Sequence, residues 1–244
     1  MINKTAVVTG SGRGIGRETA ILLCEKGLNV VICSRTGAEI DSTIEEIKQM
    51  TKTSDAAAAA ADRVIGIRCD VSNSSEVEHL IKSTIDRFKS IDILVNNAGI
   101  AYVKKLIETT EDEWDKTIDI NLKSSFLCTR AALPFMIKDR SGVIVNVSSG
   151  AGKTGFPDIS AYCASKFCMI GLTESVAWEV ANYNIRVMAI CPGEVDTQMQ
   201  QNIELTYYKK SKQNMLQPKY VAEKITEMIF KERQYHNGQS VEIG

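Results

Sequence analysis

The sequence is poor in metal-binding residues, and it has no run that could span a membrane. Only two histidines, His79 and His236, occur among 244 residues, and neither has a partner at metal-ligand spacing. We therefore expect no metal site and no Ser-His-Asp triad. The seven cysteines include no CxxC pair, which predicts reduced, buried thiols and a cytoplasmic location. No apolar run reaches the roughly 18 residues of a transmembrane helix, and we expect no signal peptide.

An excess of charge of either sign is also missing. The chain carries 29 basic and 30 acidic residues, a net charge of -1. We therefore expect no nucleic-acid partner and no binding to an anionic membrane. The chain is 44% hydrophobic and has no linker rich in proline and glycine, so it can bury one large core. We predict a single domain over residues 1–244.

Strand-like and helical segments alternate along the whole chain. The strand segments carry Val and Ile on successive residues, as buried strands do; they are Thr5–Thr9, Asn29–Ser34, Val64–Cys69, Ile91–Asn96, Gly142–Ser148, Ile185–Cys191 and Ser240–Ile243. The helical segments between them are Ile15–Lys26, Ala38–Thr51, Ser75–Lys89, Glu111–Lys138, Ala161–Asn182 and Pro218–Lys231. This alternation predicts an α/β protein with a Rossmann-type, doubly wound parallel sheet of about seven strands and helices on both faces. Ligands of such folds bind at the carboxyl ends of the strands.

Two stretches interrupt this alternation. Asp55–Asp62 contains six consecutive alanines, and we interpret it as a surface extension of the preceding helix without a function. The polar stretch Glu194–Gln217 follows the sixth strand and contains several Tyr and Lys residues. It suits either a solvated surface helix or a mobile lid over a substrate, and we assign residues 194–217 as the substrate loop.

The first strand runs into a glycine-rich loop that precedes a helix. Glycines here let the backbone turn tightly and approach a pyrophosphate, while the helix N-terminus presents free N–H groups. The pattern is TGxxxGxG rather than GxGxxG, and a glycine-rich turn without a ligand is the alternative. The loop residues that we expect to bind a dinucleotide are Gly10, Ser11, Gly12, Arg13, Gly14, Ile15 and Gly16.

The end of the second strand indicates which dinucleotide binds. Ser34 and Arg35 stand where an NAD-binding protein usually places a carboxylate, and Arg13 lies in the glycine loop. Two guanidinium groups suit a 2′-phosphate, and no acid at these positions would repel it. We therefore predict a preference for NADP(H) over NAD(H). If both arginines are merely solvated, NAD(H) is the alternative.

The ends of the third and fourth strands supply further cofactor candidates. Asp70 and Val71 follow the third strand, and Asp70 suits either the adenine amino group or the cap region of the next helix. The fourth strand is followed by small residues that would let a nicotinamide ribose lie close to the backbone. The candidates there are Asn97, Ala98 and Gly99.

Six motifs follow one another along the chain: Thr9-Gly10-x-x-x-Gly14-x-Gly16, Asn96-Asn97-Ala98-Gly99, Asn121, Ser148-Ser149, Tyr162-x-x-x-Lys166 and Pro192-Gly193. With them the chain resembles, over nearly its whole length, the classical branch of the short-chain dehydrogenase/reductase family. The resemblance implies hydride transfer between a nicotinamide and a carbonyl/alcohol pair, by a tetrad of Asn121, Ser149, Tyr162 and Lys166. It also implies a homotetramer or homodimer, and cofactor contacts from Tyr162, Lys166, Pro192, Gly193, Val195 and Thr197. A simple turn with a helix cap is the alternative for Thr197.

The Tyr-x-x-x-Lys spacing alone is weak support, because it occurs at Tyr162–Lys166, Tyr208–Lys212 and Tyr220–Lys224. Only the first pair follows a strand that ends in serines, with Ser149 one loop before the helix. Residues four apart share a helix face, so Tyr162 and Lys166 should point into one pocket. The ammonium is expected to lower the pKa of Tyr162 from its ordinary value of about 10.

Each tetrad residue has an expected role. Tyr162 would exchange a proton with the carbonyl oxygen, and Ser149 would hydrogen-bond and orient that oxygen. Lys166 would also hold the nicotinamide ribose, and Asn121 would hold a water that links Lys166 to solvent. The neighbouring Ser148 is expected to point the other way along its strand.

The substrate is the least determined part of the interpretation. The most similar family members are the 3-oxoacyl-[acyl-carrier-protein] reductases, so 3-oxoacyl thioesters are the first expected substrates and an acyl carrier protein is an expected partner. The ending Val241-Glu242-Ile243-Gly244 lacks the longer glycine-rich tail of many such reductases. The alternatives are a small ketone, a sugar or a pterin as substrate, or a protein that binds the cofactor without turnover.

Overall fold

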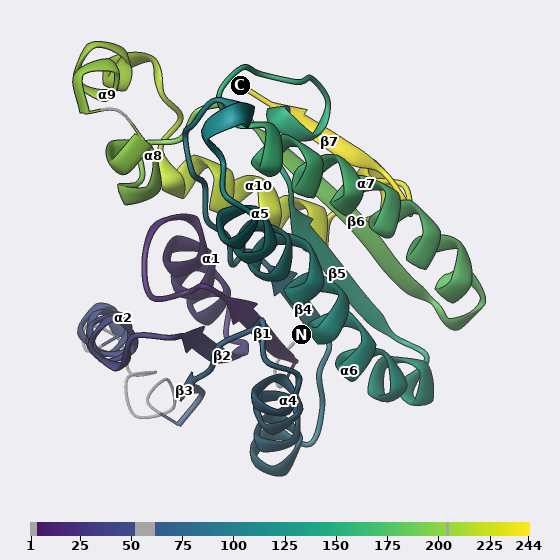
Figure 1. The fold of residues 1–244 in the computed structure, drawn as a ribbon. Coiled ribbons are helices and arrows are strands. Elements are labelled where there is room, and N and C mark those ends of the chain that lie inside the picture. Colours follow the sequence, from purple (N-terminus) through teal and green to yellow (C-terminus); the bar gives the residue numbers. More distant parts are fainter. Residues whose placement is uncertain (1–3, 52–61, 204) are drawn as a thin grey trace.

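A computed structural model describes residues 4–51, 62–203 and 205–244, and its centre is a parallel sheet. The seven strands lie in the order β3-β2-β1-β4-β5-β6-β7, and every neighbouring pair is parallel. Each lies within two residues of its predicted position; they are β1 Thr5–Thr9, β2 Asn29–Ser34, β3 Val64–Arg68, β4 Ile93–Asn96, β5 Gly142–Val147, β6 Ile185–Pro192 and β7 Ser240–Ile243. The predicted doubly wound, Rossmann-type sheet is confirmed (Figure 1).

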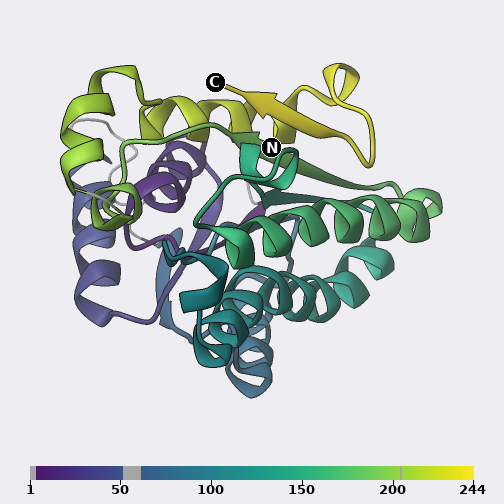
Figure 2. The same ribbon diagram turned by 45° about the horizontal axis from the view of Figure 1, so that its top comes forward.

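Helices cover both faces of this sheet. One face is covered by α1 (Gly14–Glu25), α2 (Gly37–Thr51) and α10 (Pro218–Phe230), and the other by α4 (Ser74–Phe88), α6 (Ser124–Asp139) and α7 (Ser160–Val180). The strands are apolar on successive residues because each face has its own core. In β1, Ala6 and Val8 pack with the first group of helices, and Val7 packs with the second. Figure 2 shows α6 and α7 running along one side of the sheet, with β7 at its edge.

The strand order fixes where a ligand can bind. The chain winds from β1 outward to β3, then returns and continues on the other side of β1 through β4 to β7. The connections that follow β1 and β4 therefore leave the sheet in opposite directions and open a crevice at their carboxyl ends. The glycine loop after β1 and the Asn97–Gly99 segment after β4 border this crevice.

The predicted long helix Glu111–Lys138 is interrupted. It consists of α5 (Glu111–Ile118), one π-helical turn over Asp119–Lys123, and α6. A π turn carries one extra residue, which shifts the side chains that follow around the helix axis. The interruption falls at Asn121, whose side chain is completely buried. Periodicity could not reveal it, because both helical parts keep their apolar faces.

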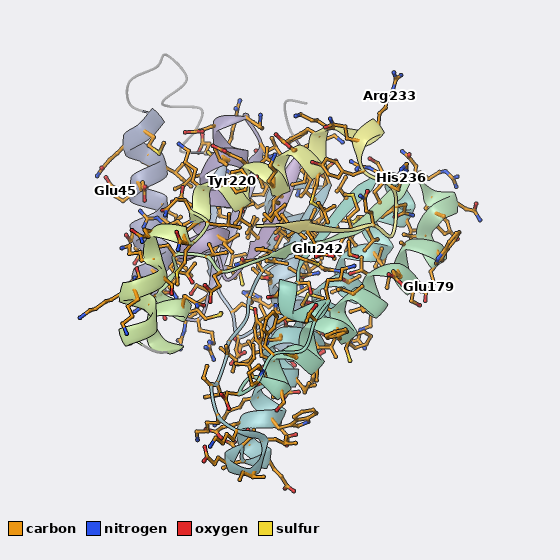
Figure 3. The ribbon with its side chains drawn as sticks, turned by 90° about the horizontal axis from the view of Figure 1, so that it is seen from above. Glu45, Glu179, Tyr220, Arg233, His236 and Glu242 are labelled. Atoms are coloured by element: carbon orange, nitrogen blue, oxygen red, sulfur yellow. The ribbon has the colours of Figure 1, made fainter. Side chains whose placement is uncertain are left out.

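The segment 194–217 is not a single helix. It contains α8 (Gln198–Ile203), α9 (Leu205–Ser211) and a short 3₁₀ turn at Lys212–Asn214, and Val195 and Leu216 pair as an isolated parallel bridge at its base. Figures 1 and 2 both show α8 and α9 at the end of the molecule where the glycine loop lies. Figure 3, which looks down on the molecule, shows Tyr220 on α10 and Glu242 on β7.

Three other expectations concern the surface and the thiols. The alanine run at 56–61 lies outside the described residues. Within the described ranges, no helix combines the length and the apolar character that crossing a bilayer requires. All seven cysteines are free, and six are buried as predicted; Cys168 on α7 is exposed, which corrects the prediction there.

Candidate active site

The crevice at the carboxyl edge of the sheet is a cavity of about 670 Å³. Most of the predicted cofactor and catalytic residues line it, although they come from all parts of the chain. The lining includes Gly10, Arg13, Gly14, Ile15, Ser34, Arg35, Asp70, Val71, Asn97, Ala98, Gly99, Ser149, Tyr162, Lys166, Pro192, Gly193, Val195 and Thr197. Four predicted residues lie behind this surface: Ser11, Gly12, Gly16 and Asn121.

The glycine loop has the form that a dinucleotide requires. Gly10 and Gly14 have positive φ angles of 62° and 57°, which side chains with a Cβ rarely adopt. A Cβ on Gly10 would lie 2.9 Å from the Ala98 Cα, and one on Gly16 would lie 2.4 Å from the Asn97 Nδ2. The helix α1 begins at Gly14 without a side-chain cap, so its first N–H groups are available to an anion. These residues therefore fit a pyrophosphate.

Ser11 and Asn97 hold this loop in shape. The Ser11 hydroxyl donates to the Val8 carbonyl at 2.6 Å and accepts from the Cys33 amide at 2.8 Å, which ties the loop to β2. The Asn97 side chain donates to the carbonyls of Thr9 and Gly10 at 2.9 and 3.1 Å. Ser11 is completely buried and outside the cavity, so its contribution is to the conformation of the loop rather than to ligand contact.

An acid that sequence reasoning did not identify lies beside the end of β2. Glu39, in the first turn of α2, lines the cavity beside Ser34 and Arg35. Its carboxylate accepts hydrogen bonds from the Ser34 hydroxyl at 2.9 Å and from Arg13 at 3.2 Å. The expectation that no acid faces these donors is therefore wrong. Glu39 was missed because it lies beyond the strand end, at no motif position; the signal was an acid in the first helical turn.

Asp70 borders the cavity but also shapes its own loop. Its Oδ1 accepts from the amide and the hydroxyl of Ser72 at 3.0 and 2.7 Å, and its amide donates to Glu76 at 2.8 Å. The N-cap of α4 is Asn73, whose side chain accepts from the Ser75 and Glu76 amides. Asp70 thus belongs to the turn before the cap, and this turn presents it to the cavity.

Tyr162 and Lys166 lie one turn apart on α7 and both reach the cavity wall. The Lys166 Nζ lies 5.5 Å from the centre of the Tyr162 ring and donates to the Val147 carbonyl at 2.8 Å. The Ser149 side chain interacts with the Tyr162 phenol and also accepts from the Ala151 amide at 3.1 Å. The end of β5 and the helix α7 thus bring the Ser149 hydroxyl, the Tyr162 phenol and the Lys166 ammonium to one wall of the cavity.

The pKa of Tyr162 shifts in the direction opposite to the expected one. Burial raises it above the ordinary value of 10, and the interaction with Ser149 opposes this rise without cancelling it. Burial also lowers the pKa of Lys166 from 10.5 to about 8. The expectation rested on the charge of Lys166 alone. Loss of solvent is instead the largest cause for both groups, and the charge of Lys166 is not among the causes that shift the pKa of Tyr162.

Asn121 reaches this cluster from the π turn. Its Nδ2 donates to the Ile100 carbonyl and to the Ser165 hydroxyl, both at 3.0 Å, and its Oδ1 accepts from the Ile100 amide at 2.8 Å. These bonds fasten the segment after β4 to α7. The side chain is thus engaged by protein groups, and the expected role of Asn121 in holding a water stays a prediction.

Gly99 is the point where these groups meet. A Cβ there would lie 3.3 Å from the Asn121 Oδ1 and 3.7 Å from the Lys166 Nζ. Ser148, by contrast, donates its buried hydroxyl to the Lys166 carbonyl at 3.0 Å, so that hydroxyl is engaged by α7. Of the two neighbouring serines, only Ser149 interacts with the phenol.

The other two Tyr-x-x-x-Lys pairs serve different contacts. The Tyr208 hydroxyl donates to Asp196, and Lys212 pairs with the same carboxylate at 3.4 Å. Tyr220 is 41% exposed on α10. Neither tyrosine lines the cavity, so identical spacing on three helices brings only Tyr162 to it.

The turn after β6 closes the remaining side of the cavity. The Gly193 amide donates to the Ile243 carbonyl at 2.8 Å, which anchors the turn to β7. The Thr197 hydroxyl accepts from the Gln200 amide at 3.4 Å at the start of α8, and its methyl group lies next to Gly14. Thr197 therefore lies at a helix start, as the alternative interpretation held, and also lines the cavity over the glycine loop.

The fold and this cavity define a class: a doubly wound α/β protein with a dinucleotide-type glycine loop at its topological switch point. The model of the short chain dehydrogenase family matches residues 4–207, and the chain belongs to this family.

Relatives with assigned names are similar over most of their length. A 3-oxoacyl-[acyl-carrier-protein] reductase of Synechocystis sp. is 38% identical over 201 residues, which cover 82% of this chain and 77% of that protein. The 3-oxoacyl-[acyl-carrier-protein] reductase FabG of Staphylococcus aureus is 41% identical over 199 residues, covering 81% and 77%.

Solved structures cover the whole chain. A variant of actinorhodin polyketide ketoreductase with NADPH has a TM-score of 0.89 at 28% identity, over 100% of this chain and 97% of that one. Levodione reductase also has a TM-score of 0.89, at 27% identity, over 100% and 96%.

Proposed function

We propose that this protein is an NADP(H)-dependent oxidoreductase that transfers a hydride between nicotinamide and a carbonyl/alcohol substrate. Its first substrate class is the 3-oxoacyl thioesters, with an acyl carrier protein as the carrier. The observation that carries the proposal is the meeting of Ser149, Tyr162 and Lys166 in the wall of a cavity that a dinucleotide-type loop also lines. The names of the relatives support the substrate class.

The residues around the cavity fit the cofactor. Gly10 and Gly16 let the loop pack closely on Asn97 and Ala98, Gly14 lines the cavity, and the start of α1 would offer N–H groups to a pyrophosphate. Ser34, Arg13 and Arg35 supply donors for a 2′-phosphate, and the related ketoreductase structure contains NADPH. Binding of NAD(H) is the alternative. When bound, the cofactor supplies or accepts the hydride.

The catalytic roles follow from the wall of the cavity. Ser149 and Tyr162 would hydrogen-bond the substrate oxygen, and Tyr162 would donate a proton to it during reduction. The phenol of Tyr162 is protonated at neutral pH and can donate a proton, while burial raises its pKa and so makes it a weaker acid than a solvated tyrosine. Lys166 would hold the nicotinamide ribose, and Asn121 would position Gly99 and α7 around it. These assignments make Tyr162 the acid and Asn121 a positioning residue.

We propose that residues 194–217 form the substrate loop of one domain. Gln198, Met199 and Gln200 line the cavity from α8, and Phe156 and Ile159 line it from the segment before α7. Side chains at these positions would contact the part of the substrate that lies beyond the carbonyl. The seven free cysteines support a reducing compartment, for which we propose the cytoplasm.

A panel of carbonyl substrates tests this function. The purified chain is mixed with NADPH and, separately, with acetoacetyl thioesters, small ketones, sugars and a pterin, and NADPH absorbance is followed. Faster oxidation with acetoacetyl thioesters than with the other substrates supports the proposal. A preference for small ketones would favour the second candidate, which the similarity to levodione reductase supports. Tight NADPH binding without turnover on any substrate would instead indicate a cofactor sensor.

A further inference from the structure

The acid Glu39 occupies the end of the cavity where Ser34 and Arg13 lie. Both of its carboxylate oxygens are used: Oε2 accepts from the Ser34 hydroxyl at 2.9 Å, and Oε1 accepts from the Arg13 Nη1 at 3.2 Å. Only 27% of the Glu39 side chain is exposed, compared with 58% for Arg13. The carboxylate is therefore part of the cavity wall.

The surroundings of Glu39 hold it there. A Cβ on Gly12 would lie 2.6 Å from the Glu39 Cβ and 2.9 Å from its Oε2, so the acid packs directly on the glycine loop. One turn further along α2, the Thr43 hydroxyl lies 3.0 Å from the Glu39 carbonyl and 3.3 Å from the Gly12 carbonyl. These contacts fix α2 against the loop. Gly12 thus has a structural reason for being glycine that does not involve the cofactor.

This carboxylate has the same chemistry as a 2′-phosphate. Both are anions that accept hydrogen bonds, and the donors that Glu39 uses are two of the three that the proposed function assigns to the phosphate. A phosphate dianion placed beside Glu39 would meet like charge in a partly buried site, which is unfavourable. A free ribose 2′-hydroxyl, by contrast, is a donor, and the carboxylate has lone pairs left to accept from it.

We propose that Glu39 is a specificity-determining residue that weakens the preference for NADP(H) over NAD(H), because its carboxylate holds the position that a 2′-phosphate needs. The inference rests on the proposed function, since it takes the dinucleotide to bind in this cavity. To bind the phosphate, Glu39 must release Ser34 and Arg13. Arg13 stays anchored meanwhile, because the same Nη1 also donates to the Gln198 Oε1 at 2.7 Å.

The test compares two nucleotide fragments that differ only in the 2′-phosphate. Binding of 2′,5′-ADP and of 5′-AMP is measured by calorimetry for the wild-type chain, Glu39→Gln and Glu39→Ala. Asp41→Asn is the matched control, because Asp41 is an exposed acid on the same helix and its substitution changes the net charge by the same amount. Thermal unfolding checks that each variant is folded. KM values for NADPH and for NADH are measured for the same chains, and their ratio shows the preference between the whole cofactors.

We expect both Glu39 variants to bind 2′,5′-ADP about tenfold more tightly, with 5′-AMP binding unchanged or weaker, and Asp41→Asn to match the wild type. A ratio of the two affinities within about twofold of the wild-type ratio would overturn the role of Glu39 alone. An equal gain in 2′,5′-ADP affinity in Asp41→Asn would also overturn it, because the effect would then come from the net charge of the chain rather than from the position of Glu39. If neither fragment binds to any of the chains, the proposed cofactor site itself is wrong.

Discussion

Tyr162 places a phenol beside the Ser149 hydroxyl in the cavity wall, and this position makes it the proposed proton donor. Its pKa is raised by burial, so the phenol stays protonated at neutral pH. We predict that Tyr162→Phe lowers the turnover number by roughly 10²–10⁴-fold, because the variant cannot donate a proton. Its dissociation constant for NADPH should not change. Turnover is measured with the best substrate of the panel, and binding by quenching of protein fluorescence.

Tyr220→Phe is the matched control for this substitution. Tyr220 has the same spacing to a lysine, but it is exposed on α10 and outside the cavity. Removing its hydroxyl should leave turnover at the wild-type level. Near-full turnover in Tyr162→Phe would remove Tyr162 from the proposed mechanism.

The buried position of Lys166 lowers the folding stability of the protein at neutral pH, because its ammonium is held away from solvent. Its folded-state pKa of about 8 lies below its ordinary value of 10.5, so between these pH values the unfolded chain binds a proton that the folded chain has lost. Folding stability from this group therefore rises as the pH increases from 8 to 10.5. The rise is about 3 kcal/mol on the scale of 1.36 kcal/mol per pKa unit.

We predict that Lys166→Met removes this rise. The difference in unfolding free energy between wild type and variant, measured by urea titration from pH 7 to pH 11, should increase in favour of the wild type as the pH is raised. Lys219→Met, which changes an exposed lysine on α10, should follow the wild type at every pH. Parallel curves for wild type and Lys166→Met would contradict the prediction.

At the scale of elements, the two short helices of residues 194–217 depend on one buried tyrosine. Tyr208 on α9 is 6% exposed; its hydroxyl donates to Asp196 and accepts from the Gln201 side chain at 3.0 Å. We predict that Tyr208→Phe loosens this segment by about 2 kcal/mol, because it removes a hydrogen bond to a charged group. Amide hydrogen exchange in 198–216 should become roughly thirtyfold faster.

The kinetic effect of Tyr208→Phe should differ from that of a substitution at Tyr162. If it contacts the substrate, Tyr208→Phe should raise KM for the substrate and leave the dissociation constant for NADPH unchanged. The conservative variant keeps the ring, which still packs in the buried position. Unchanged exchange in 198–216 would show that Asp196 and Lys212 suffice to hold the helices.

Element boundaries were predictable where a local signal marks them. Thr110 and Glu113 form a capping box at the start of α5, and the predicted start at Glu111 agrees with it. The π turn at Asn121 has no such signal, because its cause is tertiary: the amide must reach Ile100 and Ser165 at once. Motifs placed Ser149 and Tyr162 at the cavity, whereas Glu39 belongs to no motif, so its proximity to Arg13 emerged only from the packing of α2 on the loop.

At the scale of the whole molecule, three large aromatic side chains are exposed on the helices α6 and α7. Trp178 on α7 is 82% exposed, and Phe167, three turns earlier on the same side of the helix, is 45% exposed. Phe126 on the neighbouring helix α6 is 42% exposed. Large aromatic residues in a patch indicate a protein–protein interface. This patch supports the proposed homo-oligomer, a dimer or a tetramer.

We predict that the wild-type chain sediments as a dimer or tetramer and that Trp178→Glu shifts it toward the monomer, because a charge placed in an apolar interface would be buried without a partner. Sedimentation velocity over a range of protein concentrations measures the oligomeric state of the wild type and of Trp178→Glu. Trp114→Glu is the control, because Trp114 is 39% exposed but lies on α5, outside the patch. An unchanged distribution for Trp178→Glu would place the interface elsewhere on the surface. A monomeric wild type would contradict the oligomer itself, while the cavity, which one chain lines, would still account for the proposed chemistry.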